Sequence, residues 1–163
     1  DLTQYAVHRA FHQVPLLWRF HRIHHSPQAM DWLAGSRLHL VDVLVTRGLT
    51  FVPIHLLGFA EGPLFAYIAF VSAQATFIHA NVRFTFGPLR WLLATPQFHH
   101  WHHAAEPQAA NRNFAVHLPV IDRLFGSHYL PKNRWPRVYG LLGEVAPTEG
   151  WFRQLLAPFG RAN

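Results

Sequence analysis

Residues 8–25 of the chain read HRAFHQVPLLWRFHRIHH, and residues 99–103 read HHWHH. These stretches hold three spaced histidine sets: HxxxH at 8–12, HxxHH at 21–25 and a second HxxHH at 99–103. On a helix, residues four apart lie one turn apart on the same side, whereas adjacent residues are rotated by about 100° from each other. One HxxHH turn can therefore present imidazoles to two different metal ions.

The three sets supply more imidazoles than one metal ion needs, because a single ion rarely takes more than about three or four. The sequence therefore predicts two metal ions. Imidazole suits zinc, copper, iron or nickel about equally. Neither HExxH nor Glu-x-x-His occurs, which argues against a zinc protease and against a ferritin-like carboxylate site. The candidate ligands are His8, His12, His21, His24, His25, His99, His102 and His103.

The composition is typical of a domain that works at a membrane. Half of the 163 residues are apolar and only 13% are charged, below the roughly 25% of an average soluble domain. The net charge of +6 suits anionic lipid headgroups. The absence of cysteine excludes disulfides, iron–sulfur clusters and thiolate zinc sites. No nucleic-acid-binding signature is present, so a nucleic acid partner is not expected.

Residues 40–80 are mostly apolar and divide at Gly58–Pro63, which predicts a helical hairpin. The second arm, Pro63 to Ala80, is about 18 residues without a formal charge, close to the roughly 20 that span a bilayer. The first arm carries Asp42 and Arg47, which should lie near an interface or face other helices. A buried helical pair in a soluble protein is the alternative.

Charges around the hairpin predict its orientation. The connector carries Glu61 and neither lysine nor arginine, whereas both outer flanks carry arginines. By the positive-inside rule the flanks, and with them all three histidine sets, lie on the cytoplasmic face. The flanking arginines are Arg19, Arg22, Arg37, Arg83 and Arg90.

We therefore expect an all-α protein, with one domain over residues 1–163. Residues 40–80 would form an integral membrane hairpin, and residues 1–30 and 95–131 a cytosolic helical cap that carries a histidine-rich di-metal site. Residues 132–163 form the C-terminal tail. The chain begins inside what reads as an apolar helix, so we expect an N-terminally truncated fragment.

Four sequence words resemble the fatty acid hydroxylase/sterol desaturase superfamily, and in particular its bacterial sterol-desaturase-like branch. The resemblance covers roughly residues 1–131. The words are HRAFHQVPLLWRFHRIHHS (8–26), FIHANVR (77–83), TPQFHHWHHA (95–104) and NFAVHLPVIDRLFGSHYLP (113–131).

The resemblance implies an integral protein of the bacterial inner membrane that uses O2 at a di-iron centre to hydroxylate or desaturate a lipid. It implies the eight histidines as iron ligands and His79 as a ninth, although His79 could also be a polar residue that ends a membrane helix. The family often has a further histidine four residues before this position, where this chain has Ala75. An external protein would donate the electrons, because no haem, flavin or iron–sulfur signature is present.

Two further polar residues are candidates near the metals. Asn81 is a candidate ligand or a hydrogen-bond donor to a bound group. Asp122 could orient a ligand imidazole by accepting its second N–H, or it could pair with Arg123 or another arginine instead. The remaining histidines are expected to pack or to lie at an interface.

Two other functions remain open from the residues alone. The chain could be a metal-binding membrane protein without catalytic activity, although the second arm offers only Gln74 and His79 for transport. It could also be a soluble zinc-dependent hydrolase, although Asp31 and Glu106 are the nearest carboxylates to the histidine sets.

Overall fold

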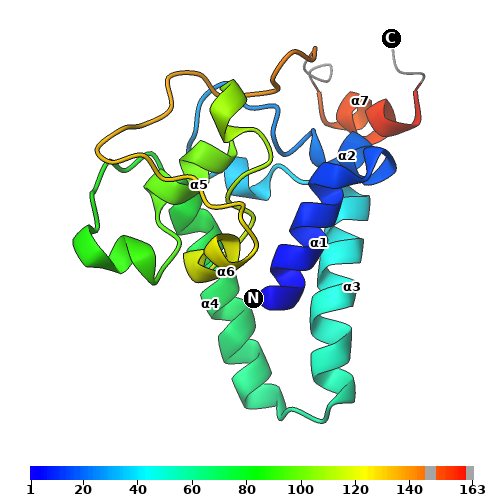
Figure 1. Cartoon of the computed structure of the whole chain (residues 1–163). Coiled ribbons are helices and arrows are strands. Elements are labelled where there is room, and N and C mark those ends of the chain that lie inside the picture. The colour runs from blue at the N-terminus through cyan, green and yellow to red at the C-terminus, as the bar shows by residue number, and fades with distance from the viewer. Residues whose placement is uncertain (146–149, 161–163) are drawn as a thin grey trace.

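The computed structural model describes residues 1–145 and 150–160, which form helices joined by irregular segments (Figure 1). No strand occurs in these residues, apart from an isolated bridge between Ala104 and Tyr139. The expected all-α fold is therefore confirmed for the described part of the chain. Two long antiparallel helices project from a head built from the shorter ones.

The projecting hairpin consists of α3 (Leu40–Leu56) and α4 (Glu61–His79). Helix α3 begins at His39, whose side chain accepts a hydrogen bond from the amide of Val41 and so caps the first turn. The connector contains Gly58 at a φ of +76°, a conformation that glycine adopts at little cost. The predicted hairpin is therefore confirmed, with a shorter connector than expected.

The membrane-spanning part of that prediction is not borne out for the described residues. None of their helices combines the length and the apolar character that a membrane crossing needs. Helix α3 has 17 residues, among them Asp42 and Arg47, and α4 has 19 and begins at Glu61.

Prolines fix where the short helices of the head begin. Helix α1 (Leu2–Gln13) ends before Pro15, because proline disfavours the helical conformation in the residue that precedes it. Pro15 then starts α2 (Pro15–His21), Pro96 starts α5 (Pro96–His102) and Pro119 starts α6 (Pro119–Leu124). Proline suits the first helical position because the amide there has no partner inside the helix.

Apolar clusters hold the histidine-bearing segments around one centre. Phe11 of α1 and Phe20 of α2 pack together against Val41 and Val45 of α3. Ile78 of α4 packs against Phe98 of α5. The C-terminal helix α7 (Trp151–Leu156) lies near α2 and the start of α3 (Figure 1). The helices that carry histidines are thereby fixed to both arms of the hairpin.

Candidate metal centre

Nine buried or half-buried histidines converge where α1, α2, α4 and α5 meet. They form two groups, and within each group one ring nitrogen per residue lies within 4.8 Å of the others. Group A consists of His8, His12, His21, His25 and His102, and group B of His24, His79, His99 and His103. The structure thus brings together all nine predicted ligands.

The division follows from the helical spacing. In each HxxHH set the first and last histidines belong to one group, and the histidine between them belongs to the other. In the first set His21 and His25 belong to group A and His24 belongs to group B. In the second set His102 belongs to group A, and the other two histidines belong to group B. One turn of chain thus faces two sites, which is the arrangement that the spacing predicts.

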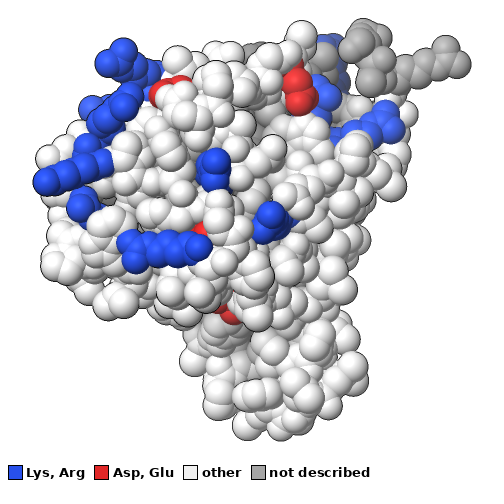
Figure 2. Space-filling model, in the orientation of Figure 1, with Lys and Arg blue, Asp and Glu red and all other residues white. Residues whose placement is uncertain are grey.

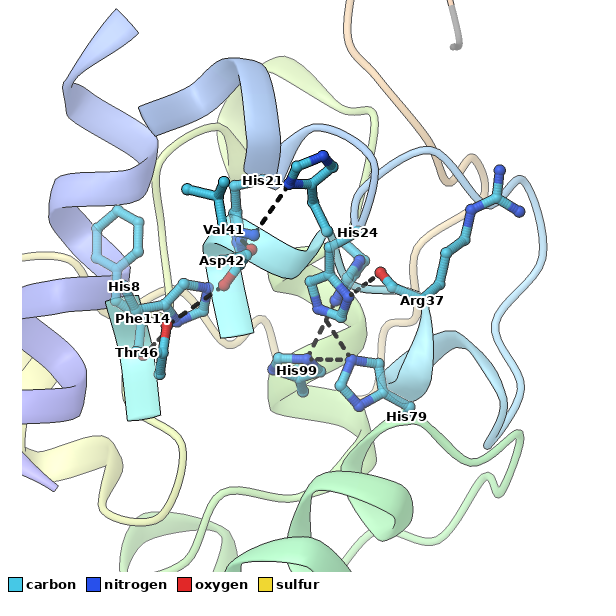
Figure 3. Close-up of polar contacts among 12 residues, drawn as sticks. His8, His21, His24, Arg37, Val41, Asp42, Thr46, His79, His99 and Phe114 are labelled. Carbon is cyan, nitrogen blue, oxygen red and sulfur yellow. Dashed lines mark hydrogen bonds and ion pairs between the residues drawn. The ribbon is translucent and has the colours of Figure 1, made fainter. Parts of the chain in front are cut away.

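In group B the Nε2 atoms already lie at the separation that a shared ion requires. The Nε2 of His79 is 2.9 Å from that of His99 and 3.3 Å from that of His24 (Figure 3), and His99 and His103 are 3.1 Å apart at the same atoms. Nitrogens bound to one ion at about 2.0–2.1 Å lie roughly 3.0–3.4 Å from each other. The four imidazoles therefore fit one ion.

Group A is marked by ring nitrogens that are buried without a partner. The Nε2 atoms of His12, His21, His25 and His102 have no hydrogen-bond partner among the described residues. A buried polar atom without a partner costs free energy, so four of them at one centre indicate a missing ligand. The histidines of group A therefore also fit a metal ion.

Hydrogen bonds at the outer nitrogens orient these rings. The Nδ1 of His8 donates to the carbonyl of Phe114 at 2.7 Å, that of His79 to Ala75 at 2.6 Å and that of His102 to Arg112 at 2.7 Å. A proton held on Nδ1 leaves the lone pair of Nε2 free for a metal.

The ring of His21 has a carboxylate as its partner. Its Nδ1 lies 2.5 Å from Oδ2 of Asp42, and both side chains are buried (Figure 3). Thr46 donates to the other carboxylate oxygen. Sequence reasoning missed this role, since it placed Asp42 at an interface or against other helices. The available signal was a lone carboxylate in the first turn of an apolar helix, close to the histidine sets.

Burial favours the neutral form of most candidate ligand imidazoles. Removal from water, together with the charges of neighbouring histidines, lowers the pKa of His8 to about 3. The same causes lower the pKa of His12, His24, His25 and His102 well below the ordinary value. A neutral ring is the form that binds a metal.

Gly35 approaches the centre so closely that a side chain there would force its neighbours to shift. A Cβ on this residue would lie 3.0 Å from Nδ1 of His79 and 3.3 Å from the carbonyl oxygen of Ala75. Gly35 lies in the short helix η1 (Ala34–Ser36). Its glycine is therefore required by the packing of a metal-facing ring.

Asn81 and Asp122 lie outside both groups. Asn81 is exposed. Asp122 is fully buried, but it accepts hydrogen bonds from the amides of Phe114 and Ala115 and from the hydroxyl of Ser127 rather than from an imidazole. It therefore holds the segment whose Phe114 carbonyl orients His8, and its contacts replace both the direct imidazole contact and the pairing with Arg123 that the sequence left open.

His100 lies between ligand positions but points elsewhere. Its Nδ1 lies 2.9 Å from the hydroxyl of Tyr139, and its Nε2 lies 3.2 Å from the carbonyl of Ala80. This buried histidine thus joins α5 to the end of α4 and to a later loop.

Relatives of this chain are lipid-modifying enzymes. The chain is 35% identical over 158 residues to ornithine lipid hydroxylase OlsE of Rhizobium tropici, covering 96% of this chain and 47% of the relative. It is 29% identical to alkylglycerol monooxygenase of Danio rerio (96% and 34% covered) and 28% identical to methylsterol monooxygenase 1-1 of Arabidopsis thaliana (78% and 43%). It thus spans about half or less of the length of these relatives.

No solved structure was found to match the chain. The family model for fatty acid hydroxylases matches residues 1–127, which include all nine histidines of groups A and B. By this match the chain belongs to the fatty acid hydroxylase family.

Proposed function

We propose that this chain forms the catalytic part of a membrane-associated enzyme that uses O2 to hydroxylate or desaturate a lipid. The observation that carries the proposal is the convergence of nine imidazoles into two groups with no carboxylate in either. Two iron ions bound there would supply the redox chemistry. In hydroxylation, one oxygen atom of O2 enters a C–H bond and the other leaves as water, with two electrons and two protons from outside.

The residues of this chain bind and orient rather than transfer protons. Groups A and B would each hold an ion through Nε2, while Asp42 and the backbone carbonyls keep the rings in place. Phe11 packs beside His21 and is almost fully buried, so it would limit the access of water to group A. The electrons would come from a separate donor protein, because the sequence carries no haem, flavin or iron–sulfur signature.

We further propose that the hairpin inserts into the lipid phase. Leu56, Leu57, Phe59 and Phe65 surround the connector and are each more than half exposed. Figure 2 shows charged side chains on the head and none on the lower part of the hairpin in that view. A lipid substrate would then reach the head from the membrane that the hairpin enters, with the histidine groups on the cytoplasmic side.

The zinc-dependent hydrolase is the weaker alternative. Hydrolysis needs a general base near the metal, and neither histidine group contains a carboxylate. Asp42 lies nearest, but it is buried and bonded to His21 and Thr46. Zinc could still occupy the groups of the isolated protein, since imidazole also binds zinc well.

His24→Ala and His102→Ala test the proposal, one in each group. Each variant should lose at least half of its bound metal and all conversion of lipid, because each removes one of the few ligands of an ion. Metal content by mass spectrometry and lipid products after aerobic incubation with reductant measure these effects. His100→Gln is the matched control, a buried histidine outside the groups. Full lipid conversion by both alanine variants would refute the proposal.

A further inference from the structure

A cavity of about 290 Å³ lies between the start of α3 and α7. Ile23, Leu38, Leu40, Val43 and Leu155 give it mostly apolar walls. Its volume lies near the lower end of the roughly 300–1,000 Å³ of small-molecule sites. The cavity is therefore large enough for part of an aliphatic chain.

Arg37 is the permanently charged residue of this cavity, and no carboxylate lines it. Its Nε is buried and has no hydrogen-bond partner among the described residues. Neither of the two ion pairs found among those residues involves Arg37. The nearby carboxylate of Asp31 lines a neighbouring pocket and accepts hydrogen bonds from the amides of Leu33 and Ala34. Arg37 also lines that pocket, yet it is paired with no carboxylate among the described residues. Its guanidinium can therefore pair with an anionic oxygen.

The cavity adjoins the metal centre through two of its wall residues. Ile23 directly precedes His24 of group B. The carbonyl of Arg37 lies 3.3 Å from Nδ1 of His24, and Figure 3 shows the side chain of Arg37 extending away from that ring. The residue that would bind the anion thus also orients a histidine of group B.

Among the polar residues of the cavity, Arg37 is the one suited to bind an anion. His39 is buried, and its ring is engaged at both nitrogens, with the amide of Val41 and with the carbonyl of Leu155. Gln154 and Ser36 are neutral and can add hydrogen bonds to a ligand. The cavity therefore combines apolar walls with a single fixed positive charge.

We propose that this cavity binds the substrate lipid as an anionic amphiphile. An aliphatic segment would lie against Leu40 and Val43, and a carboxylate or phosphate would pair with the guanidinium of Arg37. A planar guanidinium suits either oxyanion, because it can donate two parallel hydrogen bonds. The inference rests on the proposed function and names the class of lipid that the enzyme takes.

Photolabelling tests the site without turnover. The whole chain, in nanodiscs of phosphatidylcholine, is irradiated without O2 in the presence of diazirine-bearing 12-carbon probes. The probes carry a carboxylate, a phosphate monoester, a hydroxyl or an amine. Labelled peptides are identified by mass spectrometry. The carboxylate or the phosphate probe, or both, should label the peptides with Val43 and Trp151 saturably, and their difference identifies the headgroup.

Arg37→Gln should lower labelling of these peptides by the anionic probe about tenfold, because a hydrogen-bonded charge is lost. Labelling of the hairpin tip around Leu57 and Phe59, outside the cavity, should not change with the same probe, which provides an internal control. Arg137→Gln removes an exposed arginine outside the cavity and should have no effect. Val43→Trp, which fills the cavity, should reduce labelling there by every probe.

Cavity labelling by the hydroxyl probe that equals labelling by the better of the two anionic probes would overturn the proposal, as would unchanged labelling of Arg37→Gln. Metal content and lipid oxidation are measured on the same preparations. Oxidation without cavity labelling would refute only this inference. Saturable labelling without oxidation would refute only the proposed function.

Discussion

Gly35 shows how a single backbone position can constrain a candidate metal ligand. Its φ is not in the left-handed region, so conformational strain is not the reason for glycine here. The reason is the approach of the chain to His79 and to the carbonyl of Ala75 that accepts the proton of that ring. A methyl group at Gly35 would force the ring of His79 to shift by a few tenths of an ångström.

Gly35→Ala should therefore lower the metal bound by group B while group A stays loaded. We expect the metal content to fall from two ions per chain toward one, because His79 is one of four imidazoles in its group. Metal analysis of the purified variant measures this. Gly48→Ala is the matched control, since a Cβ there meets nothing within 4 Å. Unchanged metal content in Gly35→Ala would contradict the assigned contact.

Asp42 offers a second test at the residue scale. Asp42→Asn keeps the shape of the side chain but removes the charge that holds the Nδ1 proton of His21. Loss of such a carboxylate typically weakens metal affinity by about 10- to 100-fold. Competition with a chromophoric chelator measures the affinity of each ion.

In that titration the Asp42→Asn variant should lose affinity only for the ion of group A. Asp42→Glu should recover part of that affinity. Glu61→Gln, which removes an exposed carboxylate at the start of α4, serves as the control. An equal loss of affinity for both ions would indicate a general effect on folding instead.

Among the elements, the hairpin α3–α4 differs most from a helix pair of a soluble protein. Its outward side chains are mostly apolar beyond the head, with Leu56 exposed by 78% and Leu57 by 76%, although Glu61 is also exposed there. Exposed apolar surface of this extent usually marks a site of contact with another molecule or with lipid. The base of the head also carries cationic groups. Two of them belong to Arg90 and Arg123, which both lie over the ring of Trp91.

Leu56→Lys with Leu57→Lys should weaken binding to phosphatidylcholine vesicles by about tenfold or more, because each leucine loses about 1.5–3 kcal/mol of apolar transfer free energy. Flotation of the protein with vesicles measures the effect. Val145→Lys, which changes a residue that is 85% exposed on the head, is the control. Equal flotation of all variants would argue that the hairpin contacts a protein surface.

At the scale of the whole molecule, the neutral histidines predict how stability depends on pH. The pKa of His8 is lowered to about 3 and that of His100 to about 4, in both cases mainly by burial. In the unfolded chain histidines titrate near about 6.5. Between these values the unfolded state binds protons that the folded state does not.

The free energy of unfolding should therefore fall as the pH decreases from about 6.5 toward 4, by up to about 1.4 kcal/mol per pH unit for each such histidine. Denaturation in mild detergent, followed by circular dichroism, measures this slope. His100→Gln should give a shallower slope, because one titrating group is removed. A constant stability over this range would contradict the burial of these rings.

Much of this molecule could be predicted from its sequence because its signals are local. Periodic spacing indicates which histidines share a side of a turn, and apolar runs with a glycine break indicate the hairpin. The contacts of Asp42 and Asp122 could not be predicted, because they depend on how segments far apart in the chain pack. Asp122 lies in the motif that follows the third histidine set and is close to the histidines in space, yet it binds backbone amides.

The partners of His8 and His102 could not be predicted for another reason. They are the carbonyls of Phe114 and Arg112, and every residue has a carbonyl, so the side chains carry no signal. The cavity beside Arg37 likewise depends on where α7 lies against α3. Such features require the three-dimensional arrangement of the chain.

The neighbouring positions His24 and His25, and likewise His102 and His103, face different groups. The rings of His25 and His103 also stack across the boundary, with centroids 4.2 Å apart. Filling one group would thus set the direction of the peptide units that complete the other. Chains from iron-starved cells should then divide into fully loaded and empty populations, with few half-filled molecules. Iron supply would therefore alter the number of active enzyme molecules rather than the activity of each one.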